Sequence, residues 1–278
     1  NVAIGYAALV SNTTGNNNVA IGNNTLDAAS TASYNTAIGY NALTDNTTGA
    51  NNHAIGNGSQ ENTTTGNNNV SIGGGSLNAN TTGDDNVAVG HEALQVATAS
   101  NNTAIGFNAL LANTTGTQNT SVGAYSLDAN TTGGQNTAIG EASLGANTTA
   151  SNNTAVGYHA LKVNTTGSEN TAVGKEALKA NTTGINNSAL GVTALLANTT
   201  GRDNTSVGQS SLKANTTGSN NTAVGRVALF AATTANNNTA VGYAALNSCT
   251  TGVDNVGIGC SALDSSTTGE RNVAIGYE

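Results

Sequence analysis

The chain has 278 residues, of which 35 are Gly and none is Pro, Met or Trp. Aromatic residues make up 3% and charged residues 8%, whereas an ordinary globular domain has about 25% charged residues. A conventional enzyme core needs large apolar side chains of varied shape, so this composition argues against such a fold. The net charge of −8 argues against nucleic-acid binding, and no apolar run is long enough to predict membrane contact.

One short repeat accounts for the whole chain. A Gly preceded by a small residue and an aliphatic residue recurs 17 times, and 15 of the 16 intervals are 17 residues long. The interval from Gly90 to Gly106 is 16, and the missing residue falls at 97–99, which indicates a turn at this point of the repeat. These repeat Gly residues are Gly5, Gly22, Gly39, Gly56, Gly73, Gly90, Gly106, Gly123, Gly140, Gly157, Gly174, Gly191, Gly208, Gly225, Gly242, Gly259 and Gly276.

Each position of the repeat has its own rule, and residues 170–186 give a typical example. An Asn stands four residues before the repeat Gly, followed by Thr or Val except at His53 and Ser188, then a small residue, then Ile, Val or Leu. Leu stands four residues after the Gly in every complete repeat except one, where Gln60 replaces it. An Asn-Thr-Thr-Gly segment then closes most of the repeats. Charged residues are confined almost entirely to the remaining positions, which are therefore predicted to face water.

These runs predict two short strands in each repeat, for example at 170–174 and 177–180. Gly and the Asn-Thr-Thr-Gly segment favour turns between them. In the first strand, Thr and Val share one face and the small residue lies on the other. We expect the Thr and Val face to point into the core and the small residue to point away from it.

A single repeat buries too little apolar surface to fold alone, so we predict that the repeats stack. The predicted fold is all-β: a parallel β-solenoid, or β-roll, with one 17-residue, two-strand coil per repeat and about 16 coils. We expect residues 1–278 to form a single continuous array, an excerpt of a longer fibre without caps. Equivalent residues would form ladders along it, including Asn18, Asn35, Asn136, Asn170, Asn204, Val173, Val224, Leu161, Leu178 and Leu212.

Two further sets of positions predict contacts with other molecules. The small-residue position excludes bulk in every repeat, which suggests close approach by a second copy of the chain, most simply in a homotrimer. We expect this contact at Ala37, Ala138, Ala172 and Ala223. The position after the repeat Gly accepts both Tyr and Lys and is therefore a surface position; its aromatic members Tyr6, Tyr40, Phe107, Tyr158 and Tyr243 are candidate surface contacts.

No residue pattern predicts catalysis, a cofactor or a metal site. His53, His91 and His159 occupy three different positions of the repeat and lack the spacing of metal ligands. Cys249 and Cys260 are interpreted as substitutions of small residues rather than as a disulfide. Ranks of Thr suggest ice binding as an alternative function, although adjacent Thr residues in a turn do not form an alternating Thr-x-Thr plane.

The repeat resembles the head repeats of trimeric autotransporter adhesins, the YadA-like or haemagglutinin-type β-roll. Residues 220–229 (Asn-Asn-Thr-Ala-Val-Gly-Arg-Val-Ala-Leu) and 68–77 carry this resemblance, which extends over the whole chain. Related repeats occur in phage tail fibres and long bacterial surface proteins. The resemblance implies a trimer of left-handed β-rolls on a cell surface or virion tail, acting as a structural and adhesive element that binds a host receptor, matrix or neighbouring fibre. A self-assembling extracellular filament is the other alternative.

Overall fold

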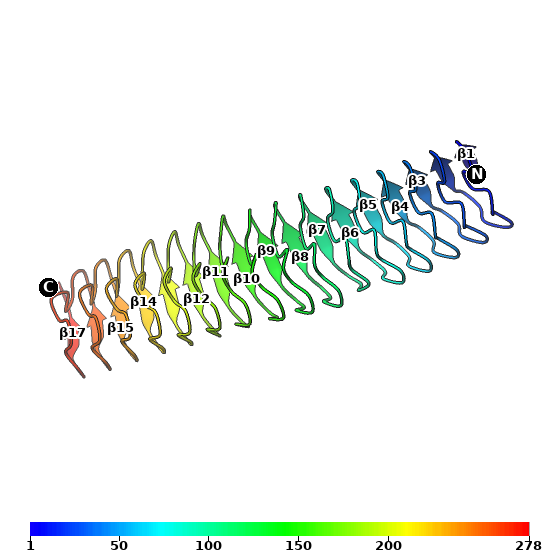
Figure 1. Cartoon of the computed structure of the whole chain (residues 1–278). Coiled ribbons are helices and arrows are strands. Elements are labelled where there is room, and N and C mark those ends of the chain that lie inside the picture. The colour runs from blue at the N-terminus through cyan, green and yellow to red at the C-terminus, as the bar shows by residue number, and fades with distance from the viewer. Residues whose placement is uncertain (278) are drawn as a thin grey trace. The chain divides into compact units, whose positions relative to one another are not determined.

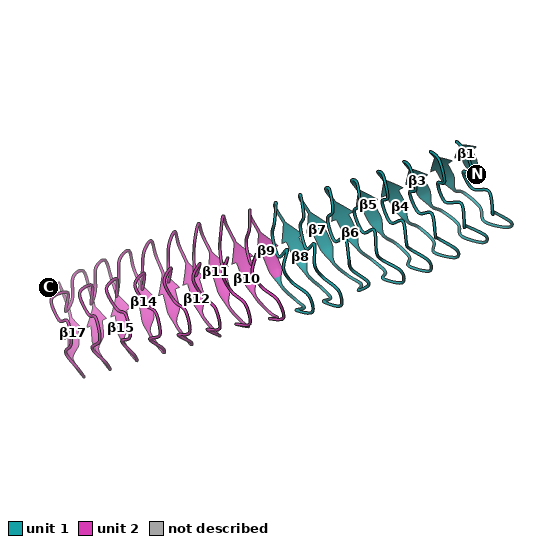
Figure 2. Cartoon of the chain, in the orientation of Figure 1, with its two compact units in different colours: residues 1–136 teal, residues 137–278 magenta. Residues whose placement is uncertain are grey.

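The computed structural model describes residues 1–277, which form two compact units (Figure 2). Unit 1 spans Asn1–Asn136 and unit 2 begins at Thr137. Both contain only three-residue strands joined by turns, and no helix occurs in residues 1–277 (Figure 1).

The strands fall at the same place in every repeat. Unit 1 contains β1 (Val2–Ile4), β2 (Val19–Ile21), β3 (Thr36–Ile38), β4 (His53–Ile55), β5 (Val70–Ile72), β6 (Val87–Val89), β7 (Thr103–Ile105) and β8 (Thr120–Val122). Unit 2 contains β9 (Thr137–Ile139), β10 (Thr154–Val156), β11 (Thr171–Val173), β12 (Ser188–Leu190), β13 (Thr205–Val207), β14 (Thr222–Val224), β15 (Thr239–Val241), β16 (Val256–Ile258) and β17 (Val273–Ile275).

Within each unit, every strand pairs in parallel with the strand of the next repeat. The pairs are in register, so that Thr154 lies beside Thr171 and Ala155 beside Ala172. The short repeat keeps this register, since Val87 still pairs with Thr103. One repeat is therefore one coil, and the prediction of a parallel β-solenoid is confirmed.

The prediction of two strands per coil is wrong. The second run, which contains the buried Leu, forms successive turns instead of a strand. Leu178 has a φ of 52°, in the left-handed region, and Glu176 has a φ of 55°. A residue with such a φ cannot continue an extended strand. Burial of the Leu side chain, worth about 1.5–3 kcal/mol, offsets the cost of this backbone conformation, about 1–2 kcal/mol.

The predicted orientation of the strand faces is also wrong. The small residues point into the coil: Ala37, Ala138, Ala172 and Ala223, expected to contact a second chain, are all 0% exposed. The Leu residues fill the same interior, and Leu161, Leu178 and Leu212 are completely buried. A Cβ on Gly257, which occupies the small position, would lie 3.1 Å from Cγ of Leu246. The coil is thus too narrow for a larger side chain opposite Leu.

The repeat Gly is required by the stacking of coils. These residues have φ values from 127° to 144°, a conformation that side chains resist. A Cβ at Gly174 would also collide with the backbone carbonyl of Gly191 in the next coil. Each strand therefore ends at its Gly, and the chain turns away from the sheet.

Candidate interaction surfaces

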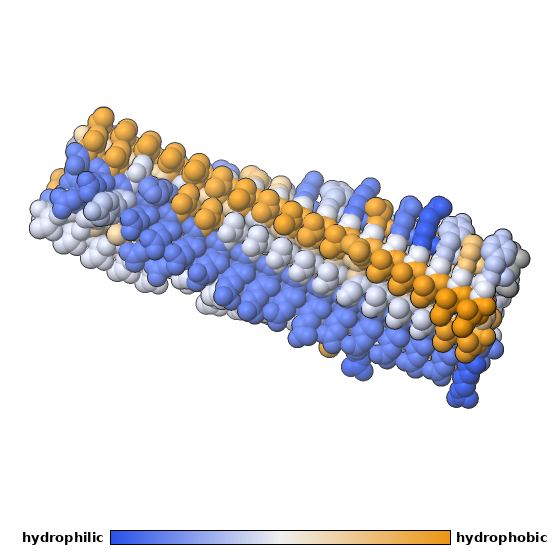
Figure 3. Space-filling model, turned by 180° about the vertical axis from the view of Figure 1, so that it is seen from behind, coloured by the Kyte–Doolittle hydropathy of each residue, from blue (hydrophilic) through white to orange (hydrophobic). Residues whose placement is uncertain are grey.

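The residue that precedes each repeat Gly points outward, and within each unit these residues form a surface that we call the aliphatic row. Its members are partly exposed although they are Ile, Val or Leu: Ile55 is 39%, Ile105 40% and Leu190 50% exposed. Figure 3 shows hydrophobic residues, in orange, gathered in a ridge on the face in view. The row comprises Ile4, Ile21, Ile38, Ile55, Ile72, Val89, Ile105 and Val122 in unit 1, and Ile139, Val156, Val173, Leu190, Val207, Val224, Val241, Ile258 and Ile275 in unit 2.

The aliphatic row changes the interpretation of two residues. Val173 and Val224 were expected in core ladders, but Val173 is half-buried and Val224 is 36% exposed on the outer face.

The first residue of each strand, usually Thr or Val, lies on the same face, and His53 is the only ionisable side chain in the strands of residues 1–277. The outer sheet face is therefore nearly uncharged and rich in methyl groups.

The Asn residues that open the repeats form the predicted ladders. Asn18, Asn35, Asn136, Asn170 and Asn204 are at most 1% exposed. The Oδ1 of Asn204 accepts from the backbone N–H of Asn221 (3.0 Å), and its Nδ2 donates to the carbonyl of Gly218 (2.9 Å). Each amide thus links its own coil to the next and to the closing turn, which satisfies buried polar groups that would otherwise destabilise the fold.

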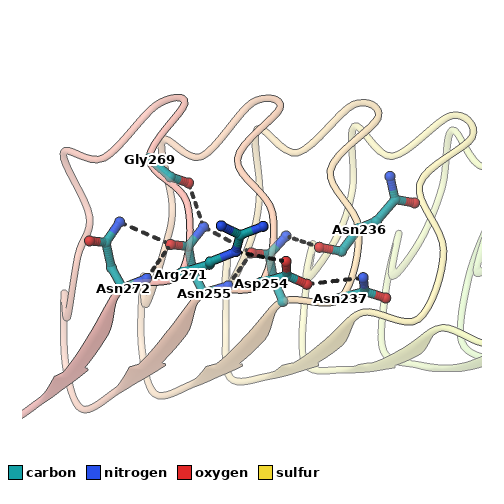
Figure 4. A network of polar contacts seen from close by, with 8 residues as sticks. Asn236, Asn237, Asp254, Asn255, Gly269, Arg271 and Asn272 are labelled. Carbon is teal, nitrogen blue, oxygen red and sulfur yellow. Dashed lines mark hydrogen bonds and ion pairs between the residues drawn. The ribbon is translucent and has the colours of Figure 1, made fainter.

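Figure 4 shows the same network at the last coils of unit 2. The N–H of Asn272 donates to Oδ1 of Asn255 (3.0 Å), and Nδ2 of Asn255 donates to the carbonyl of Gly269 (2.7 Å). Asp254, in the solvent-exposed turn beside this ladder, accepts from Nδ2 of Asn237 (3.0 Å) and lies 3.9 Å from Nε of Arg271. The buried ladder is therefore uncharged, and the charged residues are confined to its outer side.

The position after the repeat Gly, which we call the variable column, is exposed as predicted from its composition. Tyr6 is 78%, Tyr40 53%, Phe107 45%, Tyr158 43% and Tyr243 52% exposed. Their role as contacts remains a prediction. Neighbouring coils bring some of these side chains together, because Arg226 lies 5.9 Å from the ring centre of Tyr243. This column is the part of the surface that varies most between coils.

His159 lies next to Tyr158, and their rings stack with centroids 3.7 Å apart. Its Nε2 is 3.3 Å from Nζ of Lys162. Burial, followed by repulsion from Lys162 and Lys179, lowers the pKa of His159 below its usual value. Lys162 can donate a hydrogen bond to Nε2 only while that atom carries no proton, in keeping with the lowered pKa.

The remaining candidate residues are dispersed. His53, His91 and His159 belong to coils of β4, β6 and β10, and no group of three His, Cys, Asp or Glu residues suited to a metal occurs in the described part of the chain. Cys249 and Cys260 are both unpaired, and burial raises the pKa of the Cys249 thiol. Over residues 1–277, no helix is long and apolar enough to cross a membrane.

Comparison with known proteins identifies no relative of this chain. No protein-family model, no curated protein and no solved structure matches this chain.

Proposed function

We propose that this chain is a structural and adhesive element of an extracellular fibre, without catalytic activity. In this proposal, copies of the chain assemble through the aliphatic row, and the variable column contacts a host receptor, matrix or neighbouring fibre. The observation that supports it most is the outward orientation of one aliphatic residue in every coil. The resemblance to the head repeats of trimeric adhesins adds the expectation of three chains and of a location on a cell surface or virion tail.

A second copy of the chain is the partner that best fits the aliphatic row. Monomeric soluble proteins seldom leave a long contiguous apolar surface in water. The row repeats with the spacing of the coils, about 4.8 Å, and another copy carries the same spacing. Its methyl groups could then pack at every coil rather than at isolated points. Closed cyclic symmetry would cover the row on every chain, and this favours a small ring such as a trimer.

The assembly is tested with a matched pair of variants in one repeat. Val224→Glu places a charge in the aliphatic row, whereas Asn220→Glu places it in an exposed turn position that already holds Glu169 and Asp254 in other coils. In multi-angle light scattering, the unmodified chain and Asn220→Glu should give the mass of three chains, and Val224→Glu a smaller mass. A monomeric unmodified chain would refute assembly through this surface, and open-ended growth would favour the filament alternative.

Ice binding is a second candidate, supported by one observation. The first residue of many strands is Thr, as in Thr137, Thr154 and Thr171, and it shares the outer sheet face with the aliphatic row. A regular Thr-x-Val array is thus present on a parallel sheet. The first Thr of the closing turn is unsuited to this role, because Thr199 Oγ1 donates to the carbonyl of Thr216 (2.9 Å). Thermal hysteresis that is lost when strand Thr residues are changed to Lys would favour ice binding over the adhesive role.

A further inference from the structure

Unit 1 contains a surface recess where the variable column lacks a side chain. Gly74 occupies this column between Asn57 in the preceding coil and His91 in the following one, and Gly75 comes next. These residues and Glu92 line a cavity of about 350 Å³. A Cβ on Gly74 would make only ordinary contacts, at 3.6 Å from Cδ2 of His91 and 3.9 Å from the carbonyl oxygen of Asn57. The recess therefore results from a missing side chain, and backbone packing does not close it.

One wall of the recess is an aromatic ring that packs against a second ring on its far side. The His91 imidazole stacks on Phe107, with centroids 5.6 Å apart and planes inclined by 17°. Phe107 in turn contacts Tyr125 edge to face, with centroids 5.3 Å apart. Because Phe107 covers one face of the imidazole, the other face is directed toward Gly74. Rings in proteins stack at centroid separations of 4.5–7 Å, so one empty coil position of about 4.8 Å admits one further ring.

The rim of the recess is polar. Asn57 is exposed at one end. The Oε2 of Glu92 lies 3.9 Å from Nδ1 of His91, and a Cβ on Gly75 would lie 3.7 Å from Nε2 of Gln95. The rim thus offers amide donors and acceptors together with a carboxylate, around a single flat apolar face. Hydroxyl groups both donate and accept hydrogen bonds and can pair with all of these groups.

We propose that this recess, which we call the Gly74 recess, binds one neutral pyranose ring of a glycan. The C–H face of the sugar would stack on His91, and its hydroxyls would bond to Asn57, Glu92 and Gln95. An apolar side chain of a peptide fits less well, because it has no donors or acceptors and would leave these polar groups unpaired. The inference gives the proposed adhesive role a ligand and rests on it, but binding of a free sugar is measured independently of assembly.

The charge of unit 1 sets the expected selectivity. Its residues include no Lys or Arg, while its acidic residues are Asp27, Asp45, Glu61, Asp84, Asp85, Glu92 and Asp128. Glu61 and Glu92 stand in the coils on either side of Gly74. Their repulsion disfavours sulfated, phosphorylated or acidic sugars and nucleotides. Neutral hexosides are therefore the preferred class.

Ligand-observed saturation-transfer NMR on the whole chain tests the proposal. The probes are the methyl β-glycosides of glucose, galactose and N-acetylglucosamine, with methyl glucuronide as the anionic comparison and a Trp-containing tripeptide as the peptide comparison. At least one neutral glycoside should receive saturation, strongest on the C–H protons of one ring face. Glucuronide should receive less, and Glu92→Gln should reduce this difference.

Gly74→Tyr fills the recess with a side chain that the same column carries elsewhere, and Gln209→Tyr makes the same change at an exposed position of unit 2. Gly74→Tyr should abolish the signal and Gln209→Tyr should retain it. His91→Ala should weaken binding roughly two- to tenfold, the range that loss of one stacked ring implies. No saturation of any neutral glycoside, equal signals in Gly74→Tyr, or binding of the tripeptide alone would overturn the proposal. A chain that assembles but shows none of these signals would leave the fibre role intact and refute the Gly74 recess as a sugar site.

Discussion

A second ladder of Asn residues, in the closing turns, leads to a prediction of increased stability. Asn215 belongs to this turn ladder, and its Nδ2 donates to Oδ1 of Asn198 (2.8 Å) and to the carbonyl of Gly218 (2.9 Å). The next position of the ladder is Ala232, which has no amide, and the buried Oδ1 of Asn215 has no hydrogen-bond partner. The same break occurs at Asn12 and Asn46, whose Oδ1 atoms also lack a partner; Ala29 and Thr63 follow them in the ladder.

Ala232→Asn should restore the missing donor. The new Nδ2 would reach Oδ1 of Asn215 and the carbonyl of Ala235, as Asn147 does toward Ala150 in a coil with the same closing residue (3.0 Å). The new Oδ1 would face Cys249, which has no amide, so the change moves the unpaired acceptor to position 232 and does not remove it. The gain therefore comes from the two new hydrogen bonds, each of which contributes about 0.5–1.5 kcal/mol. After the loss of side-chain freedom, we expect a gain of about 0.5–1 kcal/mol in the free energy of unfolding.

Urea unfolding measures this gain as a higher midpoint, and amide hydrogen exchange locates it to the coils on either side. Ala231→Asn is the matched control, because Ala231 is only half-buried and lies outside the ladder; it should change the midpoint little. A midpoint for Ala232→Asn equal to or below that of the unmodified chain would refute the idea that the missing amide at position 232 limits stability here.

Three further predictions follow from the same coil geometry. Ala172→Phe should destabilise the fold by about 1–3 kcal/mol through overpacking. Lys175→Phe, in the exposed variable column that holds Phe107 in another coil, should leave the unfolding midpoint nearly unchanged, and equal midpoints would contradict the inward position of Ala172. Val227 has a φ of 52°, which is unfavourable for a β-branched residue. Val227→Asn should therefore raise the free energy of unfolding by about 1 kcal/mol, measured by urea unfolding. A lower free energy of unfolding for this variant would show that the backbone at Val227 is not strained. Burial and the nearby Lys162 hold the pKa of folded His159 below its ordinary value of 6.5, so the folded state binds this proton less tightly and stability should fall as pH drops through 6.5. His159→Asn should remove this part of the pH dependence, and an NMR titration midpoint above 6.5 for His159 would contradict the reasoning.

The repeat length and the coil were predictable because 17 copies of one pattern leave a single consistent alignment. Strand direction, register and the buried Asn ladders all follow from that alignment. The 16-residue repeat confirms where the turn lies, because Ala97, Thr98 and Ala99 close a turn with one residue fewer. The backbone N–H of Asn102 still donates to Oδ1 of Asn86 (3.0 Å). Periodicity of two in a strand assigns residues to two faces, but it does not say which face is inside.

A signal for the correct face was nevertheless present in the sequence. Ser replaces Ala at the small position in three coils, and in each of them Ser also stands five residues later. Ser71 and Ser76 have their Oγ atoms 2.6 Å apart in the buried interior, and Ser121 with Ser126 and Ser206 with Ser211 repeat this contact. The rule holds in one direction only, because Ser59 and Ser143 stand at the later position in coils that keep Ala at the small position. A Ser at the small position thus always has a second hydroxyl to pair with, as a buried hydroxyl requires. The left-handed φ of the Leu residues gave no comparable signal, because Leu is not a residue type that favours this conformation.

The coil that contains Gln60 combines two departures from the repeat. Gln60 takes the place of Leu with the same left-handed φ, 51°, and is 0% exposed, yet its Oε1 has no hydrogen-bond partner. Thr63, in the turn ladder three residues later, is also buried with an unpartnered Oγ1. Each unsatisfied group costs about 1–3 kcal/mol, so this coil should open before its neighbours.

Amide hydrogen exchange tests this order of opening. Amides of residues 57–66 should exchange faster than the equivalent amides of residues 74–83, in which Leu77 and Asn80 fill the two positions. Gln60→Leu combined with Thr63→Asn should slow exchange to the rate of that neighbouring coil, and Thr65→Ser, at an exposed turn position, should not. Equal exchange in the two unmodified coils would mean that the interior accommodates an amide in place of a Leu without loss of local stability, and the argument from unpaired polar atoms would then fail for the solenoid as a whole.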